Sequence, residues 1–169
     1  MLVATFRIDN ERKIGAVNSE ARTVAPFDFR RDVSAQGIAA IIGVADVLPM
    51  LRQVPLEDVK MEAPVPRPFR NIFCVGKNYF DHAEEFSRSG FDSTAASVVP
   101  SAPIFFSKVP ESVVPTGAVV TARPEVSTAI DYEAELAVII GKKGRGISQK
   151  DAMDYIWGYT IVNDVTARD

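Results

Sequence analysis

The chain has 169 residues, of which 47% are hydrophobic and 24% charged, and its formal net charge is −3. This composition excludes a disordered, collagen-like or coiled-coil chain and predicts one ordinary domain, or a small domain with part of a larger one. We expect a cytoplasmic protein without nucleic-acid or membrane partners, because the sequence has no basic tract, no secretory signal and no apolar run of the about 20 residues that span a bilayer.

The first 68 residues predict a small β-rich domain. Residues 2–29 contain short apolar runs separated by polar turns, which is typical of β-strands. Residues 38–53 carry apolar side chains at helical spacing and predict a helix of about a dozen residues. Three prolines follow between positions 64 and 68, and they fix the chain in an extended form. We therefore place the domain boundary there and divide the chain into domains 1–68 and 69–169.

The second domain is predicted to alternate strands with two short helical segments. Cys74 is the only cysteine, so an intrachain disulfide is excluded, and we expect this residue to be a small buried apolar side chain. Ser148 stands where it could cap a helix running to about Tyr155. The expected elements are a strand at 71–76, a helix start at 77–90, a polar loop at 90–101, strand–turn–strand at 103–117, the strongest strand at 130–141 and a last strand at 157–169.

Three carboxylates alternate along the strongest strand. Asp131, Glu133 and Glu135 share one face, because successive side chains of a strand point to opposite faces. The residues between them are apolar and suit a core. Like charges this close raise each other's pKa unless a cation neutralises them, and hard divalent cations prefer oxygen ligands. The pattern therefore favours a metal site on this face.

A fourth carboxylate, Asp164, ends the last predicted strand. The helix between the two strands is long enough for a crossover that would place them parallel and adjacent. Contact between Asp164 and the two glutamates is a hypothesis at this point. The alternative is a solvated strand end whose carboxylates pair with Lys142, Lys143 or Arg145, and the pattern leaves both interpretations open.

The only histidine, His82, lies three residues before Glu85 on one face of the predicted helix. A carboxylate beside an imidazole raises its basicity, so the two could form a dyad that takes a proton from water. The alternative is an exposed acidic helix that happens to contain a histidine.

Four segments carry a family resemblance. NIFCVGKNYFDHAEE, PIFFSK, DYEAELAVIIG and GYTIVNDVTARD occur in the order seen in the fumarylacetoacetate hydrolase family, from about Asn71 to Asp169. The resemblance implies an α+β, mostly β fold: a mixed β-roll, here incomplete, preceded by the family's small β-rich N-terminal domain. Family members continue past the TARD motif and supply an active-site lysine there, which Lys108 cannot replace by its position. The chain thus resembles the N-terminal part of a longer member, and we expect it to expose a sheet edge and an unfinished core.

The resemblance also implies roles for individual residues and a homodimer. Asp131 has no role that can be carried over and is left as a strand-end charge. The family pattern corresponds to metal ligands Glu133, Glu135 and Asp164 for Mg²⁺ or Mn²⁺, a water-activating pair His82 and Glu85, and Arg168 as a contact of the substrate carboxylate.

These roles predict a hydrolase that cleaves a C–C bond in a 1,3-diketo acid of the fumarylacetoacetate or acylpyruvate type. A 2-oxo acid would chelate the cation, which would stabilise the enolate formed on cleavage. We expect residues 90–101 to act as a lid over the substrate. Two alternatives stay open: an isomerase or decarboxylase of 2-hydroxyhepta-2,4-diene-1,7-dioate-type diacids from aromatic catabolism, and a truncated module without catalytic activity.

Overall fold

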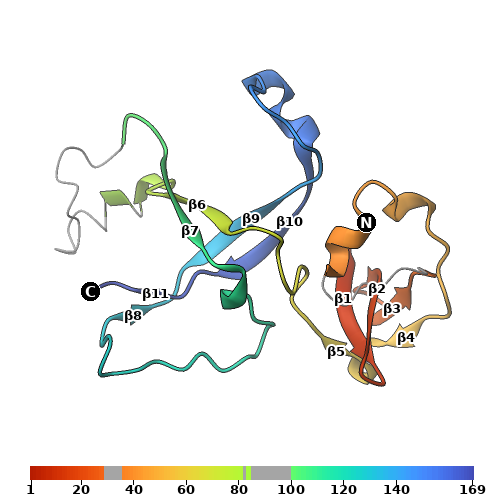
Figure 1. Cartoon of the computed structure of the whole chain (residues 1–169). Helices are drawn as coiled ribbons and strands as arrows, with labels where there is room; N and C mark the ends of the chain where they lie inside the picture. The colour runs from red at the N-terminus through yellow and green to blue at the C-terminus, as the bar shows by residue number, and fades with distance from the viewer. Residues whose placement is uncertain (29–35, 82, 85–99) are drawn as a thin grey trace.

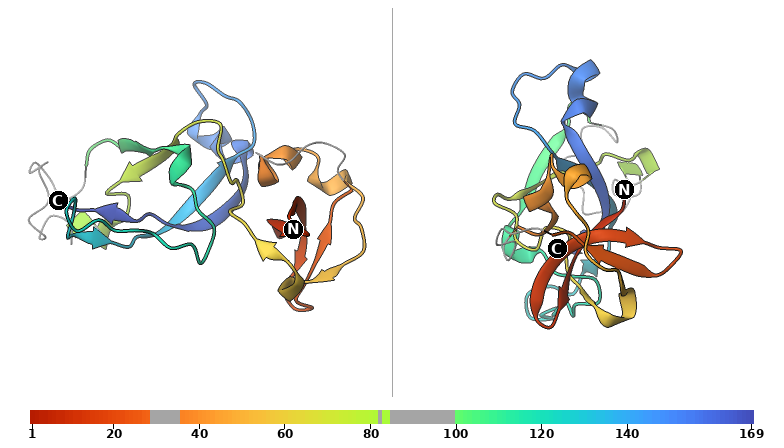
Figure 2. Two further views of the ribbon diagram at one scale, coloured as in Figure 1. Left: turned by 60° about the horizontal axis from the view of Figure 1, so that its bottom comes forward. Right: turned by 90° about the vertical axis from the view of Figure 1, so that its right-hand side faces the viewer.

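The computed structural model describes residues 1–28, 36–81, 83–84 and 100–169. β-Strands dominate this part of the chain, as predicted, and most of its helical segments are short 3-10 turns. Figure 1 shows two groups of strands, one in red to yellow and one in green to blue, which the chain joins after β5. The left-hand view of Figure 2 separates the two groups clearly. No helix among the described residues is long and apolar enough to cross a membrane.

The N-terminal group is one antiparallel sheet of short strands in the order β4-β3-β2-β1-β5. Its side chains alternate between two faces, and both faces are covered. Phe6 packs with Ala4 and Val24 on one face, whereas Ile14 belongs to a second buried cluster. The strands predicted in this region are confirmed as β1 (Val3–Ile8), β2 (Glu11–Asn18) and β3 (Thr23–Pro26), and the sheet is completed by β4 (Val54–Pro55) and β5 (Lys60–Met61).

The prediction of one helix over residues 38–53 is wrong. The segment contains two 3-10 turns, η1 (Gly37–Ile41) and η2 (Ala45–Val47), and a third, η3 (Leu56–Asp58), follows β4. Gly43 separates η1 from η2 with a φ of +82°, which is a left-handed conformation that a right-handed helix cannot contain. The apolar spacing still places Ile38 and Ile41 in the core, where they pack with Ile14 and Phe27.

A buried hydroxyl ties η1 to the proline-containing connection. Thr5 is fully buried, and its Oγ1 donates to the carbonyl oxygen of Pro64 at 2.7 Å and accepts the N–H of Ile38 at 3.1 Å. The Ile38 N–H also reaches the Pro64 oxygen at 2.9 Å. Gly37 lies against this junction with a φ of +50°, and a Cβ there would stand 2.8 Å from Thr5 Oγ1 and closer still to Pro64. The junction therefore needs glycine at position 37.

We expect Gly37→Ala to destabilise the chain clearly more than Gly43→Ala. Both glycines have positive φ, so both variants lose about 1–2 kcal/mol to the left-handed conformation. Only the Cβ at position 37 meets neighbouring atoms, since the space around Gly43 is open. Chemical denaturation measures the difference, and equal losses in the two variants would show that the junction has room for a methyl group.

Glu62, the residue after β5, forms ion pairs with the hairpin of β1 and β2. Glu62 Oε1 is 2.7 Å from Nε of Arg7, and Glu62 also pairs with Arg12. The hydrogen bond from Arg12 is the main reason why the pKa of Glu62 lies below its usual range, and burial opposes this effect. The pairing stabilises the position at which the chain leaves the N-terminal sheet.

The second group consists of three antiparallel strand pairs, β6–β7, β9–β10 and β8–β11. The strongest predicted strand is interrupted at Tyr132 and Glu133, so that its first two residues pair with β11 instead of β10. The segment predicted as strand–turn–strand forms one strand followed by η4. The bounds are β6 (Ile72–Gly76), β7 (Ile104–Lys108), η4 (Pro110–Ser112), β8 (Ile130–Asp131), β9 (Ala134–Ile140), η5 (Gln149–Tyr155), β10 (Ile156–Asn163) and β11 (Thr166–Ala167).

The prediction that the two carboxylate-bearing strands run parallel is wrong, because β9 and β10 are antiparallel. The expected short helix exists as η5, with Ser148 at its N-cap. It does not carry the chain back across the sheet. Gly141 N–H donates to the Tyr155 carbonyl at 2.8 Å, which closes the turn at the end where β9 leaves and β10 begins. The connection is therefore a long hairpin and not a crossover.

One face of β9–β10 is apolar and exposed. Leu136 lies opposite Ile161, and Val138 lies opposite Tyr159, so these four side chains share a face. They are 55%, 81%, 44% and 53% exposed, in that order. The prediction that the apolar side chains of this strand lie in a core is therefore wrong for Leu136 and Val138, and their exposure agrees instead with the expected unfinished core. Trp157, at the start of β10, instead packs against the N-terminal cluster around Ile14 and Phe27.

Candidate functional site

The antiparallel register places the predicted carboxylates at one end of β9–β10. The Asp164 N–H donates to the Glu133 carbonyl at 2.8 Å, so the two residues stand opposite each other just beyond the last ladder pair. Glu135 lies opposite Val162 and therefore belongs to the same face as Glu133 and Asp164. The hypothesis that Asp164 comes close to the strand of the two glutamates is thus supported at the level of the backbone, although for a strand direction that was not expected.

The backbone of Glu133 is held by two hydrogen bonds, one to the last residue of β10 and one to the residue that follows it. Its N–H donates to Oδ1 of Asn163 at 3.0 Å, and its carbonyl accepts the bond from Asp164. This pairing explains how a residue between two strands keeps a fixed position. Its side chain is 13% exposed, so the carboxylate is turned into the protein.

Arg168 pairs with two of the carboxylates. Its Nε and Nη2 lie 3.2 Å and 3.1 Å from Oδ2 of Asp131, and Nη2 also contacts Glu133. The β8–β11 pair brings these residues together, because Thr166 lies opposite Asp131. Asp131, to which the family pattern assigns no role, is therefore a partner that orients the guanidinium of Arg168.

Asp164 pairs with a lysine from a different strand. Nζ of Lys108, the last residue of β7, lies 2.6 Å from Oδ1 of Asp164. The same ammonium is 3.2 Å from the Val165 carbonyl and 3.3 Å from Oγ1 of Thr166. Lys108 precedes the carboxylate motifs and does not replace the later lysine of the family, so its sequence position provided no reason to expect it here. Only the side-by-side placement of β7 and the turn after β10 could have revealed it.

Cys74 lies near the same carboxylates from the side of β6. Its pKa is raised, first by burial and next by the negative charge of Asp164, with smaller effects of the same sign from Glu135 and Glu133. The thiol is half-buried and free. The protonated thiol is therefore favoured, and Cys74 lacks the lowered pKa that activates a thiolate nucleophile.

The predicted pair His82 and Glu85 lies outside the described residues. The neighbouring residues that are described form part of a helical turn, in which the Ala83 N–H donates to the Tyr79 carbonyl at 2.9 Å and Ala83 is fully buried. The predicted lid at 90–101 likewise falls almost wholly outside the described part of the chain.

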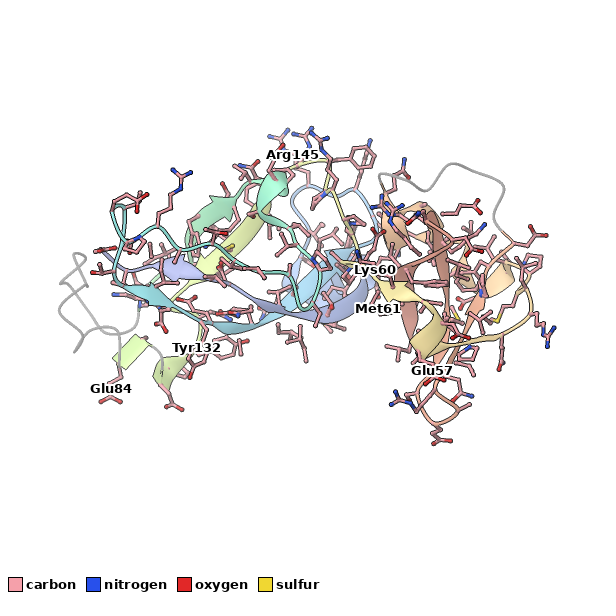
Figure 3. The ribbon with its side chains drawn as sticks, turned by 90° about the horizontal axis from the view of Figure 1, so that it is seen from below. Glu57, Lys60, Met61, Glu84, Tyr132 and Arg145 are labelled. Carbon is pink, nitrogen blue, oxygen red and sulfur yellow. The ribbon has the colours of Figure 1, made fainter. Side chains whose placement is uncertain are left out.

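The alternative of a solvated strand end is wrong for Glu133 and Asp164. Both side chains are only 13% exposed, and their partners are Arg168 and Lys108. Figure 3 shows that Arg145 lies at the opposite margin of the molecule from Tyr132, the neighbour of Glu133. Lys142 is directed to the Tyr155 ring, whose centroid is 5.8 Å from its Nζ.

The donor set fits a hard divalent cation. Glu133, Glu135 and Asp164 carry carboxylate oxygens on one face, the type of ligand that Mg²⁺ and Mn²⁺ prefer. Four acidic residues (Asp131, Glu133, Glu135 and Asp164) accompany the two cations Lys108 and Arg168, and the formal excess of two negative charges would balance a divalent ion. As the side chains stand, no three acidic, histidine or cysteine residues of the described chain are arranged to hold a metal. Binding would therefore require some of these side chains to reorient.

Comparison with protein families identifies the second half of the chain. The model described as fumarylacetoacetate (FAA) hydrolase C-terminal matches residues 71–169. Oxaloacetate tautomerase YisK of Bacillus subtilis is 48% identical over 114 residues, which are 68% of this chain and 36% of that protein. A mitochondrial oxaloacetate tautomerase of Homo sapiens is 43% identical over 127 residues, or 75% of this chain and 36% of the relative.

Solved structures agree with this match. Fumarylacetoacetate hydrolase from Exiguobacterium antarcticum is 31% identical with a TM-score of 0.64 and covers 99% of this chain and 56% of its own. Maleylpyruvate hydrolase from Sphingobium sp. SYK-6, in complex with manganese(II) and pyruvate, is 26% identical with a TM-score of 0.65 and covers 99% of this chain and 60% of its own. The fold prediction is confirmed, and the chain spans about a third of the curated relatives and somewhat over half of the solved chains.

Proposed function

Because the chain belongs to the fumarylacetoacetate hydrolase family, we propose that it contributes the acidic half of a site for enolate chemistry on a 2-oxo acid. The observation that carries the proposal is the pairing of Glu133 and Asp164 across the end of β9–β10, with Arg168 beside Glu133. This arrangement combines oxygen ligands for a divalent cation with a guanidinium that could bind a carboxylate.

Different residues of the chain would bind the cation and the substrate carboxylate. Glu133, Glu135 and Asp164 would hold Mg²⁺ or Mn²⁺, which when bound acts as a Lewis acid toward a keto oxygen and favours loss of a neighbouring proton or acyl group. Arg168 would bind and orient the substrate carboxylate, since its planar fork matches a carboxylate in two hydrogen bonds. Asp131 would hold the guanidinium of Arg168 in this orientation.

The first candidate reaction is the interconversion of keto and enol forms of a short 2-oxo diacid such as oxaloacetate. Two relatives at 48% and 43% identity are named as oxaloacetate tautomerases. Tautomerisation needs only proton transfer next to a polarised carbonyl, so it makes no demand for an activated water.

The second candidate is the predicted hydrolysis of a 1,3-diketo acid. The solved maleylpyruvate hydrolase, with its bound manganese(II) and pyruvate, supports this reaction for a protein 26% identical to this chain. Hydrolysis also requires water to be activated, and His82 with Glu85 is our proposed pair for that step. Isomerisation or decarboxylation of dienoic diacids would use the same carboxylates.

A substrate panel tests the proposal. The protein is mixed with Mn²⁺ and with enol oxaloacetate, an acylpyruvate or a hydroxylated dienoic diacid, and the loss of each enol absorbance is followed with and without a chelator. We expect chelator-sensitive acceleration of oxaloacetate ketonisation. Faster cleavage of the acylpyruvate would favour hydrolysis instead, and no acceleration of any substrate would favour a module without catalytic activity.

A further inference from the structure

Lys108 connects the β6–β7 hairpin to the carboxylate end of β10. It is the last residue of β7, whereas its contacts lie in residues 164–166, more than fifty positions later in the sequence. Its side chain is 28% exposed and that of Asp164 is 13% exposed, so their pairing is largely shielded from water. Shielding makes such a pair stronger than an ion pair on the surface.

The ammonium of Lys108 has no donor left for another ligand. A lysine carries three N–H donors, and Lys108 has three acceptors within hydrogen-bonding distance: Oδ1 of Asp164 at 2.6 Å, the Val165 carbonyl at 3.2 Å and Thr166 Oγ1 at 3.3 Å. The Thr166 hydroxyl in turn donates to the Asp164 carbonyl at 3.1 Å. One cation therefore fixes both the backbone turn and the carboxylate of Asp164.

The direction of the Asp164 side chain depends on this support. The backbone of Glu133 is held through its N–H by Asn163 and through its carbonyl by Asp164. Asp164 lies between the end of β10 at Asn163 and the start of β11 at Thr166, outside both strands. Without Lys108 its side chain would be less restricted, because hydrogen bonds to the backbone do not determine χ1.

We propose that Lys108 is a positioning residue that directs the Asp164 carboxylate and thereby sets the affinity of the acidic site for a divalent cation. The proposal rests on the proposed function insofar as Asp164 is a ligand. In this arrangement Oδ1 of Asp164 would stay with Lys108, and Oδ2 would be the oxygen that binds the cation.

A role as a simple counter-charge predicts the opposite effect on binding. Removing a positive charge next to three carboxylates would strengthen the attraction for a cation, so Mn²⁺ would bind more tightly. Removing a positioning partner instead leaves the ligand unordered, and the loss of such outer partners typically weakens metal binding by about 10–100-fold. The sign of the change therefore distinguishes the two roles.

The experiment is a calorimetric titration of Mn²⁺ into the protein and three variants. Lys108→Met keeps the length of the side chain and removes its charge and donors, and we expect about 10–100-fold weaker binding. Lys108→Arg keeps the charge but cannot direct three bonds from one nitrogen, and we expect partial recovery. Lys143→Met, in the exposed turn before η5, removes the same charge from the surface and should bind Mn²⁺ within about twofold of the parent.

A fourth variant, Thr166→Val, keeps the test decisive if Lys108→Met does not fold. Thr166→Val removes the hydroxyl that accepts from Lys108 and donates to Asp164, and it should weaken Mn²⁺ binding in the same direction by a smaller factor. Unchanged or tighter binding in folded Lys108→Met, or in Thr166→Val where the first variant is unfolded, would overturn the positioning role. A parent protein that does not bind Mn²⁺ would instead contradict the proposed function itself.

Discussion

Replacing Glu133 by glutamine is expected to abolish detectable Mn²⁺ binding and to slow any metal-dependent reaction of the protein by about 10²–10³-fold. Glu133 is the best-placed of the proposed ligands, since its backbone is fixed by Asn163 and Asp164 and its side chain is turned inward. Glutamine keeps the shape but loses the charge, and Lewis-acid stabilisation of a transition state is worth several kcal/mol. Calorimetry with Mn²⁺, with and without oxalate as an enolate mimic, measures the first effect and the enol assay measures the second.

Glu125→Gln is the matched control for this prediction. Glu125 is exposed in the segment before β8, so the same chemical change should alter neither binding nor rate. If Glu133→Gln stays folded and still binds Mn²⁺ like the parent protein, Glu133 is not a metal ligand and its carboxylate serves only to hold Arg168.

Replacing Arg168 by methionine is expected to separate anion binding from metal binding. Hydrogen bonds to a charged group contribute about 1.5–3 kcal/mol, so loss of the guanidinium should weaken Mn²⁺-dependent oxalate binding by about 10–150-fold. Mn²⁺ alone should still bind, because Asn163 and Asp164 fix the backbone of Glu133 without Arg168. The oxalate affinity of Arg168→Lys should lie between those of the parent protein and Arg168→Met, since lysine keeps the charge but not the planar fork.

The control for charge is Arg145→Met in the exposed turn that precedes η5. It removes one positive charge far from the carboxylates and should leave oxalate binding unchanged. Equal oxalate affinities of Arg168→Met and the parent would show that Arg168 acts only as the partner of Asp131 and Glu133, and that the substrate carboxylate binds elsewhere.

The sequence predicted local structure well where polar and apolar side chains alternate along a strand. The alternation of carboxylates with apolar residues around Glu133 and Glu135 predicted their shared face, and the register with β10 agrees with it. The short 3-10 turns were missed because apolar spacing does not distinguish them from an α-helix, and Gly43 has enough freedom to end either. The apolar spacing of such a segment indicates which side chains are buried, but it does not determine the backbone conformation between them.

The direction of β10 and the partners of the carboxylates could not be read from spacing. A helix of seven residues fits both a crossover and a long hairpin, and the hydrogen bond between Gly141 and Tyr155 selects the hairpin. Lys108 reaches Asp164 from a strand that is distant in sequence, so no local motif contains the pair. The ligand roles of Glu133, Glu135 and Asp164, the domain division, the homodimer and the pair of His82 and Glu85 stay predictions.

Trp157 gives the protein an internal optical reporter. It is the only tryptophan, and it contacts the N-terminal cluster from the first residues of β10, the strand whose far end leads to Asp164. Its fluorescence therefore registers contact between the two groups of strands, separately from the order within either of them. A red shift in emission without loss of β-sheet circular dichroism would mean that the groups part while each stays folded. The same signal would reveal whether cation binding at one end of β10 tightens the contact at the other.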